Sequence, residues 1–221
     1  MVNIEHYIAR LTDLLQAEFG ERLLYVGLQG SYLRGEATEN SDIDIMVILD
    51  CLCVADLDVY RGMIQAMGDY DKSCGFICGR DDLANWNPLE IRNLLGSTKD
   101  YYGLLTDFVP GFTEQDKRNF VKMSLNNLYH ELCHRYIHAD RDTNAQALPF
   151  TYKGVFFILQ NLQELRSGTF HGTGGELLKV LEGSDRAVLE RSMAMKRGES
   201  FDFDESYDLI FRWCRDTLQT I

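Results

Sequence analysis

Two aspartates, Asp42 and Asp44, are the side chains whose type and spacing point most directly to chemistry. They lie at the start of an apolar segment, Ile43–Leu49, which has the length and composition of a strand covered on both faces. Side chains two residues apart on a strand project from the same face, so we expect the two carboxylates side by side. Adjacent carboxylates repel each other, and a bound cation is the simplest compensation. Their hard oxygen atoms suit Mg²⁺, which bridges phosphate oxygens and neutralises charge during phosphoryl transfer.

A glycine and a serine precede these aspartates at a fixed distance. Gly30 and Ser31 follow the apolar run Leu23–Leu28 and lead into a segment with the length of a short helix. Such a turn exposes backbone N–H groups and a hydroxyl where a triphosphate can bind. A bare Asp-x-Asp pattern often means only that Ser41 and Asp42 finish a turn, but its combination with the upstream Gly-Ser pair is specific. The combination predicts a site for Mg²⁺ and a nucleoside triphosphate such as ATP.

The whole segment over residues 30–44, G-S-x-x-R-G-x-A-x-x-x-S-D-I-D, resembles the signature of the polymerase-β-like nucleotidyltransferase superfamily. The resemblance implies transfer of a nucleoside monophosphate from a Mg²⁺-bound triphosphate. It assigns Asp42 and Asp44 to catalysis and to the metal, and Gly30, Ser31, Arg34 and Ser41 to the nucleotide.

The order of segments also resembles that of the streptomycin/spectinomycin adenylyltransferases. The runs Asp81-Asp82-Leu83 and Trp86-Asn87-Pro88 follow the third predicted strand, and the segment Leu159–Lys179 has the form of a helix followed by a turn. This resemblance implies that AMP passes from Mg-ATP to a hydroxyl of a small acceptor, such as a cationic aminoglycoside, with release of pyrophosphate.

The superfamily pattern fails at one point, the third carboxylate that its members place on the next strand. The predicted strand Ser73–Cys78 contains no acid, and Cys74 stands where the acid falls by alignment. A thiol is a poor ligand for Mg²⁺. The chain would then work with two carboxylates, recruit Asp69 or Asp71 from the approach to the strand, or bind nucleotide without catalysis.

Transfer also needs a base near the acceptor hydroxyl. By resemblance to the adenylyltransferases, this role falls near Asp107, with Glu131 as the competitor, and each is otherwise an ordinary solvated carboxylate. Lys153 lies in an apolar helical segment, where its side chain would either extend to solvent or reach the triphosphate from a second domain.

Three histidines recur every four residues in the same helical segment as Glu131. His130, His134 and His138 share one helix face, so they would pack against a neighbour, line a cleft or bind a transition metal.

The elements that must position these residues follow from hydrophobic periodicity. The N-terminal part predicts a helix over residues 3–19, strands at Leu23–Leu28, Ile43–Leu49 and Ser73–Cys78, a short helix after Gly30, and a helix at Val54–Met67. Together with the resemblance, this order predicts an α/β (α+β) nucleotidyltransferase domain with a mixed sheet over residues 1–111.

The character of the sequence changes after Pro110-Gly111. Thr113 and Asp116 form a capping-box pattern that opens a helix running to about His138. Further helices are predicted at Pro149–Arg166, Gly174–Glu182, Ser184–Lys196 and Asp204–Leu218. We therefore expect an all-α helical bundle domain over residues 112–221.

The composition and charge of the chain limit the kinds of partner that we expect it to bind. The 221 residues carry a formal net charge of −12, which repels phosphate backbones and argues against a nucleic-acid acceptor. No signal-like start and no membrane-spanning run are present, so we expect a cytoplasmic protein without membrane contact, and a homodimer is compatible with the sequence. The six cysteines are expected to be buried, reduced thiols.

Three functions fit these features. The first is an adenylyltransferase acting on a small hydroxylated acceptor. The second keeps the chemistry but modifies a protein hydroxyl, as antitoxin-like nucleotidyltransferases do. The third is a catalytically degenerate nucleotide-binding module, which the missing third carboxylate suggests.

Overall fold

The computed structural model describes residues 2–221, apart from the side chains of residues 89 and 92. The chain forms two compact units, Met1–Phe112 and Thr113–Ile221, which are described separately below.

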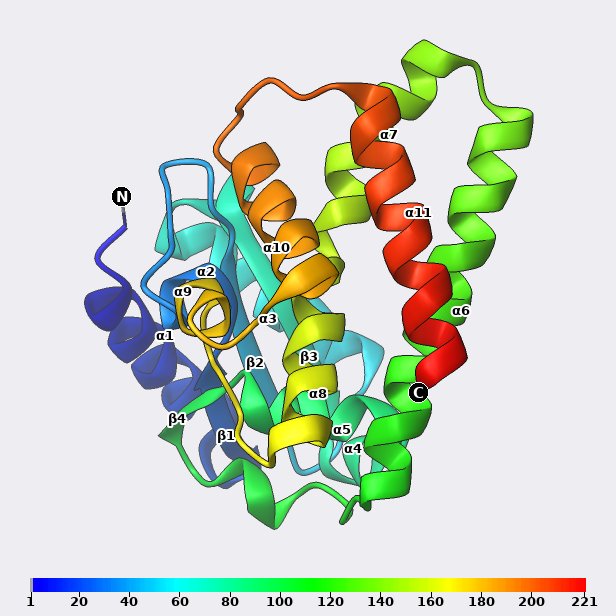
Figure 1. Ribbon diagram of the computed structural model, residues 1–221. Helices are drawn as coiled ribbons and strands as arrows, with labels where there is room; N and C mark the ends of the chain where they lie inside the picture. Colours follow the sequence, from blue (N-terminus) through cyan, green and yellow to red (C-terminus); the bar gives the residue numbers. More distant parts are fainter. Residues whose placement is uncertain (1) are drawn as a thin grey trace. The chain divides into compact units, whose positions relative to one another are not determined.

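Unit 1 is built on a four-stranded sheet with the strand order β3-β2-β1-β4 (Figure 1). β2 pairs in parallel with β3 and antiparallel with β1, and β1 pairs antiparallel with β4. The predicted mixed sheet is therefore confirmed, although β4 was not anticipated. The strands are β1 Leu23–Leu28, β2 Ile43–Leu49, β3 Ser73–Gly79 and β4 Lys99–Tyr102.

Helices cover both faces of this sheet. The predicted helices α1, α2 and α3 are present, whereas α4 and α5 were missed. Their bounds are α1 Ile4–Phe19, α2 Gly30–Leu33, α3 Val54–Met67, α4 Arg80–Ala84 and α5 Pro88–Gly96, with 3₁₀ turns at Gly20–Arg22, Tyr70–Lys72 and Leu105–Asp107.

Strand β2 separates two apolar clusters because its side chains alternate between the faces of the sheet. Ile43, Ile45 and Val47 pack with residues of α1 and α3. Met46 and Ile48 belong to the cluster on the other face, which includes residues of α4, α5 and the turn Leu105–Asp107. All of β2 is buried except Asp44, which is half-buried. The alternation assigns Asp44 to the same face as Met46.

The carboxyl end of β2 carries an ionic cluster that was not predicted. Arg22 donates from Nη1 and Nη2 to both carboxylate oxygens of Asp56, each at 2.9 Å, and from Nε to Oδ1 of Asp50 at 3.1 Å. Asp56 is only 6% exposed, and it also accepts from the backbone N–H of Cys53 at the start of α3. The hydrogen bonds from Arg22 and Cys53 lower the pKa of Asp56.

Unit 2 consists of helices, as predicted. The Thr113 hydroxyl caps α6 by accepting from the backbone N–H of Asp116 at 3.2 Å, and the Asp116 carboxylate accepts from the backbone N–H of Thr113 at 2.7 Å. The helices are α6 Glu114–His138, α7 Arg141–Lys153, α8 Val155–Ser167, α9 Gly174–Leu178, α10 Gly183–Lys196 and α11 Phe203–Thr220.

One helix prediction in unit 2 was wrong. The segment Pro149–Arg166 is not a single helix: α7 starts earlier, with Asp140 as its cap, and Gly154 separates it from α8. Glycine is a weak helix former, and the Asp140 side chain supplies an N-cap that the apolar pattern alone did not reveal. Pro149 is tolerated inside α7.

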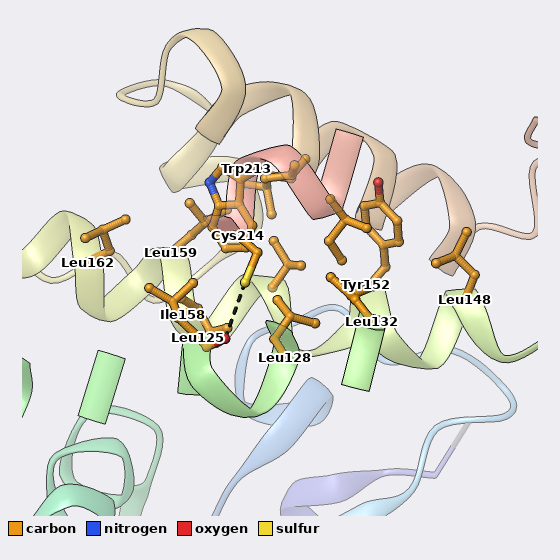
Figure 2. Close-up of a cluster of buried hydrophobic side chains, with 14 of the residues drawn as sticks. Leu125, Leu128, Leu132, Leu148, Tyr152, Ile158, Leu159, Leu162, Trp213 and Cys214 are labelled. Atoms are coloured by element: carbon orange, nitrogen blue, oxygen red, sulfur yellow. Dashed lines mark hydrogen bonds between the residues drawn. The ribbon is translucent and has the colours of Figure 1, made fainter. Parts of the chain in front are cut away.

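The core of unit 2 takes side chains from all of α6 to α11, and Figure 2 shows the part that α6, α7, α8 and α11 contribute. Trp213 and Cys214 of α11 lie among leucines of α6 and α8, and the Cys214 thiol donates to the carbonyl oxygen of Leu125 at 3.3 Å. Burial raises the pKa of this thiol to about 12, so it stays protonated. Within the described residues, no helix has both the length and the apolar composition needed to cross a membrane.

Candidate functional site

Asp44 and Gly30 are in direct contact. A Cβ atom placed on Gly30 would lie 1.9 Å from Oδ2 of Asp44, and Gly30 adopts a φ of +69°. The backbone N–H of Gln29 donates to the carbonyl oxygen of Asp44 at 2.8 Å, which fixes the end of β1 against the start of β2. The predicted Gly-Ser turn and the predicted carboxylate are thus brought together, and only glycine leaves room for this approach.

Asp42 lies one residue before β2 and is exposed. The preceding residue, Ser41, closes a turn: its hydroxyl accepts from the backbone N–H of Thr38 at 2.8 Å, and its own N–H donates to the Thr38 carbonyl at 3.1 Å. Ser41 therefore shapes the loop that delivers Asp42 to the sheet edge.

Ser31 and Arg34 lie in and just after α2. Ser31 is half-buried, and its carbonyl accepts from the backbone N–H of Glu36 at 2.9 Å. Arg34 Nε lies 3.3 Å from Oε2 of Glu36, and the side chains of both are largely buried. The guanidinium of Arg34 is therefore oriented by Glu36 within the same turn.

Cys74 stands next to Asp44 across the β2–β3 ladder, where the two residues are register partners. Cys74 is a mostly exposed residue. Desolvation of its thiol and, after it, the negative charges of Asp44 and Asp42 raise the pKa of the thiol. All six cysteines are free, but Cys51, Cys53 and Cys74 are exposed, so the expectation of uniformly buried thiols was wrong.

Asp69 and Asp71 precede β3, as predicted. Asp69 adopts a left-handed conformation with a φ of 53°. Burial and, after it, the charge of Asp69 raise the pKa of Tyr7, which belongs to the cluster on the α1 side of the sheet. Asp71 is exposed in the turn Tyr70–Lys72. The position of Asp69 near Tyr7 associates it with the face opposite to Asp44.

The two candidate bases lie in different units. Asp107 is exposed in the turn Leu105–Asp107 of unit 1. Glu131, on α6 of unit 2, accepts from the hydroxyl of Thr151 at 2.9 Å and lies 3.2 Å from Nε of Arg135. Lys153 is the exposed last residue of α7, so it lies at a helix end and not inside a continuous apolar helix.

The three histidines of α6 form an exposed row. The ring centroids of His130 and His134 are 5.9 Å apart, and those of His134 and His138 are 4.7 Å apart. Because all three side chains are exposed, ordinary packing within unit 2 does not account for them.

A set of polar residues beneath the Gly30 turn was not found from the sequence. The Gln29 side chain donates to the hydroxyl of Thr98 at 2.8 Å, and the Tyr25 hydroxyl donates to Asp100 at 2.6 Å. Thr98 and Asp100 lie just before and within β4, the strand that was missed. These contacts tie the end of β1, and therefore Gly30, to β4.

The donor set fits a divalent cation bound together with phosphate. Asp42 and Asp44 provide hard oxygen atoms at the start of β2, and the Asp44 carboxylate lies against Gly30. In phosphoryl-transfer sites Mg²⁺ typically takes one or two carboxylates from the protein and other oxygens from the nucleotide. Among residues 2–221, no group of three or more His, Cys, Asp or Glu side chains is arranged to hold a metal ion by itself.

A cavity of about 710 Å³ lies elsewhere, in unit 2, along α10 and the segment that leads to α11. Charged side chains of both signs line it, among them Glu190, Arg191, Arg197 and Glu205. None of the candidate site residues named from the sequence lines this cavity.

The fold and site define a class. Residues 10–72, which include the Gly30 turn and both aspartates, match the family model of the nucleotidyltransferase domain. This match supports the nucleotidyltransferase class that residues 30–44 predicted. No curated protein sequence matches the chain.

Solved structures add the architecture of both units. A spectinomycin adenyltransferase, AAD(9) from Enterococcus faecialis, solved with ATP and spectinomycin, aligns with a TM-score of 0.63 over 98% of this chain and 100% of its own, at 14% identity. At that identity the likeness establishes the fold.

Toxin–antitoxin complexes align less well. One, solved with AMP-PNP, has a TM-score of 0.33 at 22% identity over 62% of this chain and 94% of its own. A Shewanella oneidensis complex of a tri-AMPylated HEPN toxin with the MNT antitoxin has a TM-score of 0.31 at 20% identity, over 61% and 93%. These scores are too low to support an argument.

Proposed function

We propose that this chain transfers AMP from ATP to a hydroxyl group of a small cationic acceptor, such as an aminoglycoside, and releases pyrophosphate. The observation that carries the proposal is the contact between Asp44 and Gly30, with Asp42 at the same sheet edge. Asp44 lies beside the turn at the start of α2 and Asp42 lies two residues before Asp44, both within a region that matches the nucleotidyltransferase domain.

The reaction follows from this arrangement. The acceptor oxygen forms a bond to the α-phosphorus, the bond from that phosphorus to the bridging oxygen breaks, and pyrophosphate leaves with the electron pair. A divalent cation held by Asp42 and Asp44 would supply neutralisation of the phosphate charge. Ser31 would contact the phosphates, and Arg34, oriented by Glu36, would lie near them.

The proton of the acceptor hydroxyl passes to a base. We assign this role to Asp107 ahead of Glu131, because Glu131 is already engaged by Thr151 and Arg135 within unit 2. Lys153, exposed at the end of α7, remains a candidate for contact with the triphosphate.

The charge of the chain supports a cationic acceptor. A net charge of −12 attracts polycations and repels nucleic acid. The structural relative with the TM-score of 0.63 was solved with spectinomycin, which motivates aminocyclitols and aminoglycosides as the first acceptors to test.

A second function is favoured by one specific observation. Cys74 is the register partner of Asp44, where a third oxygen ligand would complete a set of carboxylates. A nucleotide-binding protein without transferase activity would bind ATP at the same turn and release no pyrophosphate with any acceptor.

The experiment that tests the proposal measures pyrophosphate release from ATP over a panel of aminoglycosides, aminocyclitols and host lysate. It is run in parallel with Mg²⁺, Mn²⁺ and Co²⁺, and the Asp42→Asn/Asp44→Asn variant is the control. Acceptor-dependent release that the variant lacks supports the transferase and identifies the acceptor class. ATP binding without release under any metal would overturn it in favour of the binding module.

A further inference from the structure

The thiol of Cys74 shares the sheet edge with the two candidate metal ligands. β2 and β3 run in parallel with Asp44 opposite Cys74, so the two side chains project from the same face. Cys74 is also exposed to solvent, so a cation can reach it. A cation that binds Asp44 beside a nucleotide would therefore meet a sulfur atom at the adjacent position.

A sulfur ligand changes which cation a metal site prefers. Mg²⁺ takes oxygen ligands and loses water reluctantly, whereas thiolates favour softer ions such as Zn²⁺ and bind Co²⁺ in the same manner. A neutral thiol in place of a carboxylate also removes one negative charge, which weakens the attraction of a hard cation. Both effects act against Mg²⁺ at this edge.

We infer that Cys74 is the residue that determines metal specificity at this site, and that Asp44 and Cys74 bind a thiophilic first-row divalent cation, Co²⁺ or Zn²⁺, in preference to Mg²⁺. The inference rests on the proposed function in one respect, because the phosphate oxygens of ATP complete the coordination. On binding, the thiol loses its proton to solvent and the sulfur forms a bond to the metal.

Cobalt gives a direct readout, because Co²⁺–thiolate bonds produce a charge-transfer absorption in the near ultraviolet. The full chain is titrated with Co²⁺ in the presence of α,β-methylene-ATP, which cannot release pyrophosphate. We expect the absorption in the native chain, its loss in Cys74→Ser, and its retention in Cys51→Ser, a matched control with another exposed thiol. Circular dichroism of each variant verifies that it is folded.

A second variant tests the preference in the opposite direction. Cys74→Asp adds a hard oxygen ligand and one negative charge, so it should bind Mg²⁺ at least about tenfold more tightly than the native chain and show no charge-transfer absorption. Asp44→Asn should weaken Co²⁺ binding, since it removes the neighbouring ligand.

The outcomes separate this inference from the proposed function. A charge-transfer absorption that persists in Cys74→Ser, or none in the native chain, overturns the inference even if Mg²⁺ supports transfer. An absorption that depends on Cys74, together with no transfer under any metal, supports the metal assignment and leaves only nucleotide binding as the function.

Discussion

The two ends of strand β2 both carry carboxylates, but they are surrounded in opposite ways. At the carboxyl end, Asp50 and Asp56 are bound by Arg22, a cation from the chain itself. At the amino end, Asp44 is the register partner of Cys74 and lies against the α-carbon of Gly30, and Asp42 stands one residue before the strand. The carboxylates that follow the strand are thus bound by an arginine, whereas Asp44 at its start lies beside a thiol and a glycine.

This difference teaches which carboxylates hold the fold together and which are suited to an external cation. The Arg22 guanidinium and the Cys53 N–H lower the pKa of Asp56, so its charge stabilises the folded state. At the amino end, burial and, after it, the negative charges of Asp44 and Asp42 raise the pKa of Cys74, so these carboxylates oppose a further negative charge beside them. A bound divalent cation would relieve that repulsion, whereas removal of Arg22 would create repulsion at the other end.

The largest expected effect comes from the amino end. Asp42→Asn/Asp44→Asn should lower the rate of nucleotidyl transfer by on the order of 10²- to 10³-fold, because it removes both carboxylate ligands. The melting temperature should stay the same or rise slightly, since two adjacent like charges are lost. Steady-state kinetics and thermal unfolding of the same preparations measure the two effects. A variant that loses activity and stability together would mean that these aspartates are structural.

Gly30 allows a sharper test of the same end. Gly30→Ala would place its Cβ 1.9 Å from Oδ2 of Asp44, so the carboxylate must move. A displacement of about 1 Å at a reacting site can cost about 10²-fold in rate, and we expect a loss of about tenfold to 10²-fold.

The matched control for this variant is Gly35→Ala. Gly35 has nearly the same backbone conformation, with a φ of +67°, but no heavy atom lies within 4 Å of an added Cβ. Both variants carry the strain of a left-handed alanine, on the order of 1 kcal/mol, and Gly30→Ala also displaces Asp44, so its melting temperature should fall at least as far as that of Gly35→Ala. Equal losses of activity in the two variants would rule out a specific role for the contact between Gly30 and Asp44.

The sequence predicted the amino end of β2 better than the carboxyl end, for a physical reason. Gly30, Ser31, Asp42 and Asp44 lie within one short segment, so their spacing alone implied a common site. The ion pair between Arg22 and Asp56 joins residues 34 positions apart in the chain. Arg22 precedes β1, and Asp56 lies in the first turn of α3, after β2. Hydrophobic periodicity reveals which face of an element is apolar, but it does not reveal which charged residues far apart in the sequence form ion pairs.

The fold shows the same limit. β1, β2 and β3 were predicted because apolar runs mark buried strands, whereas β4 reads Lys99-Asp100-Tyr101-Tyr102 and has no apolar run. It becomes a strand by pairing with the edge of β1, and the Tyr25 hydroxyl bonds to Asp100 there. The partners of Gln29 were missed with it, since Thr98 lies just before that strand.

At the carboxyl end, Asp56→Asn should lower the melting temperature by several degrees and leave transfer within about twofold of the native rate. The buried carboxylate would be replaced by a neutral amide, and Arg22 would keep only Asp50 as an ionic partner. Asp50→Asn is the milder companion, because the Asp50 side chain is 41% exposed and its ion pair is screened by water. A large loss of activity in either variant, with stability unchanged, would contradict this division of roles.

The smallest expected effect is a pH dependence that belongs to Asp56. Its pKa is lower in the folded chain than in the unfolded chain, so its contribution to stability is complete above the unfolded value of about 4. That contribution declines as the pH falls below about 4, toward the folded pKa. Melting curves of the native chain and Asp56→Asn between about pH 2 and 7 isolate this term, since the other carboxylates are common to both. The difference in melting temperature should be constant near neutral pH and shrink in acid. A difference that stays the same down to the lowest pH would mean that Asp56 acts through packing and not through its charge.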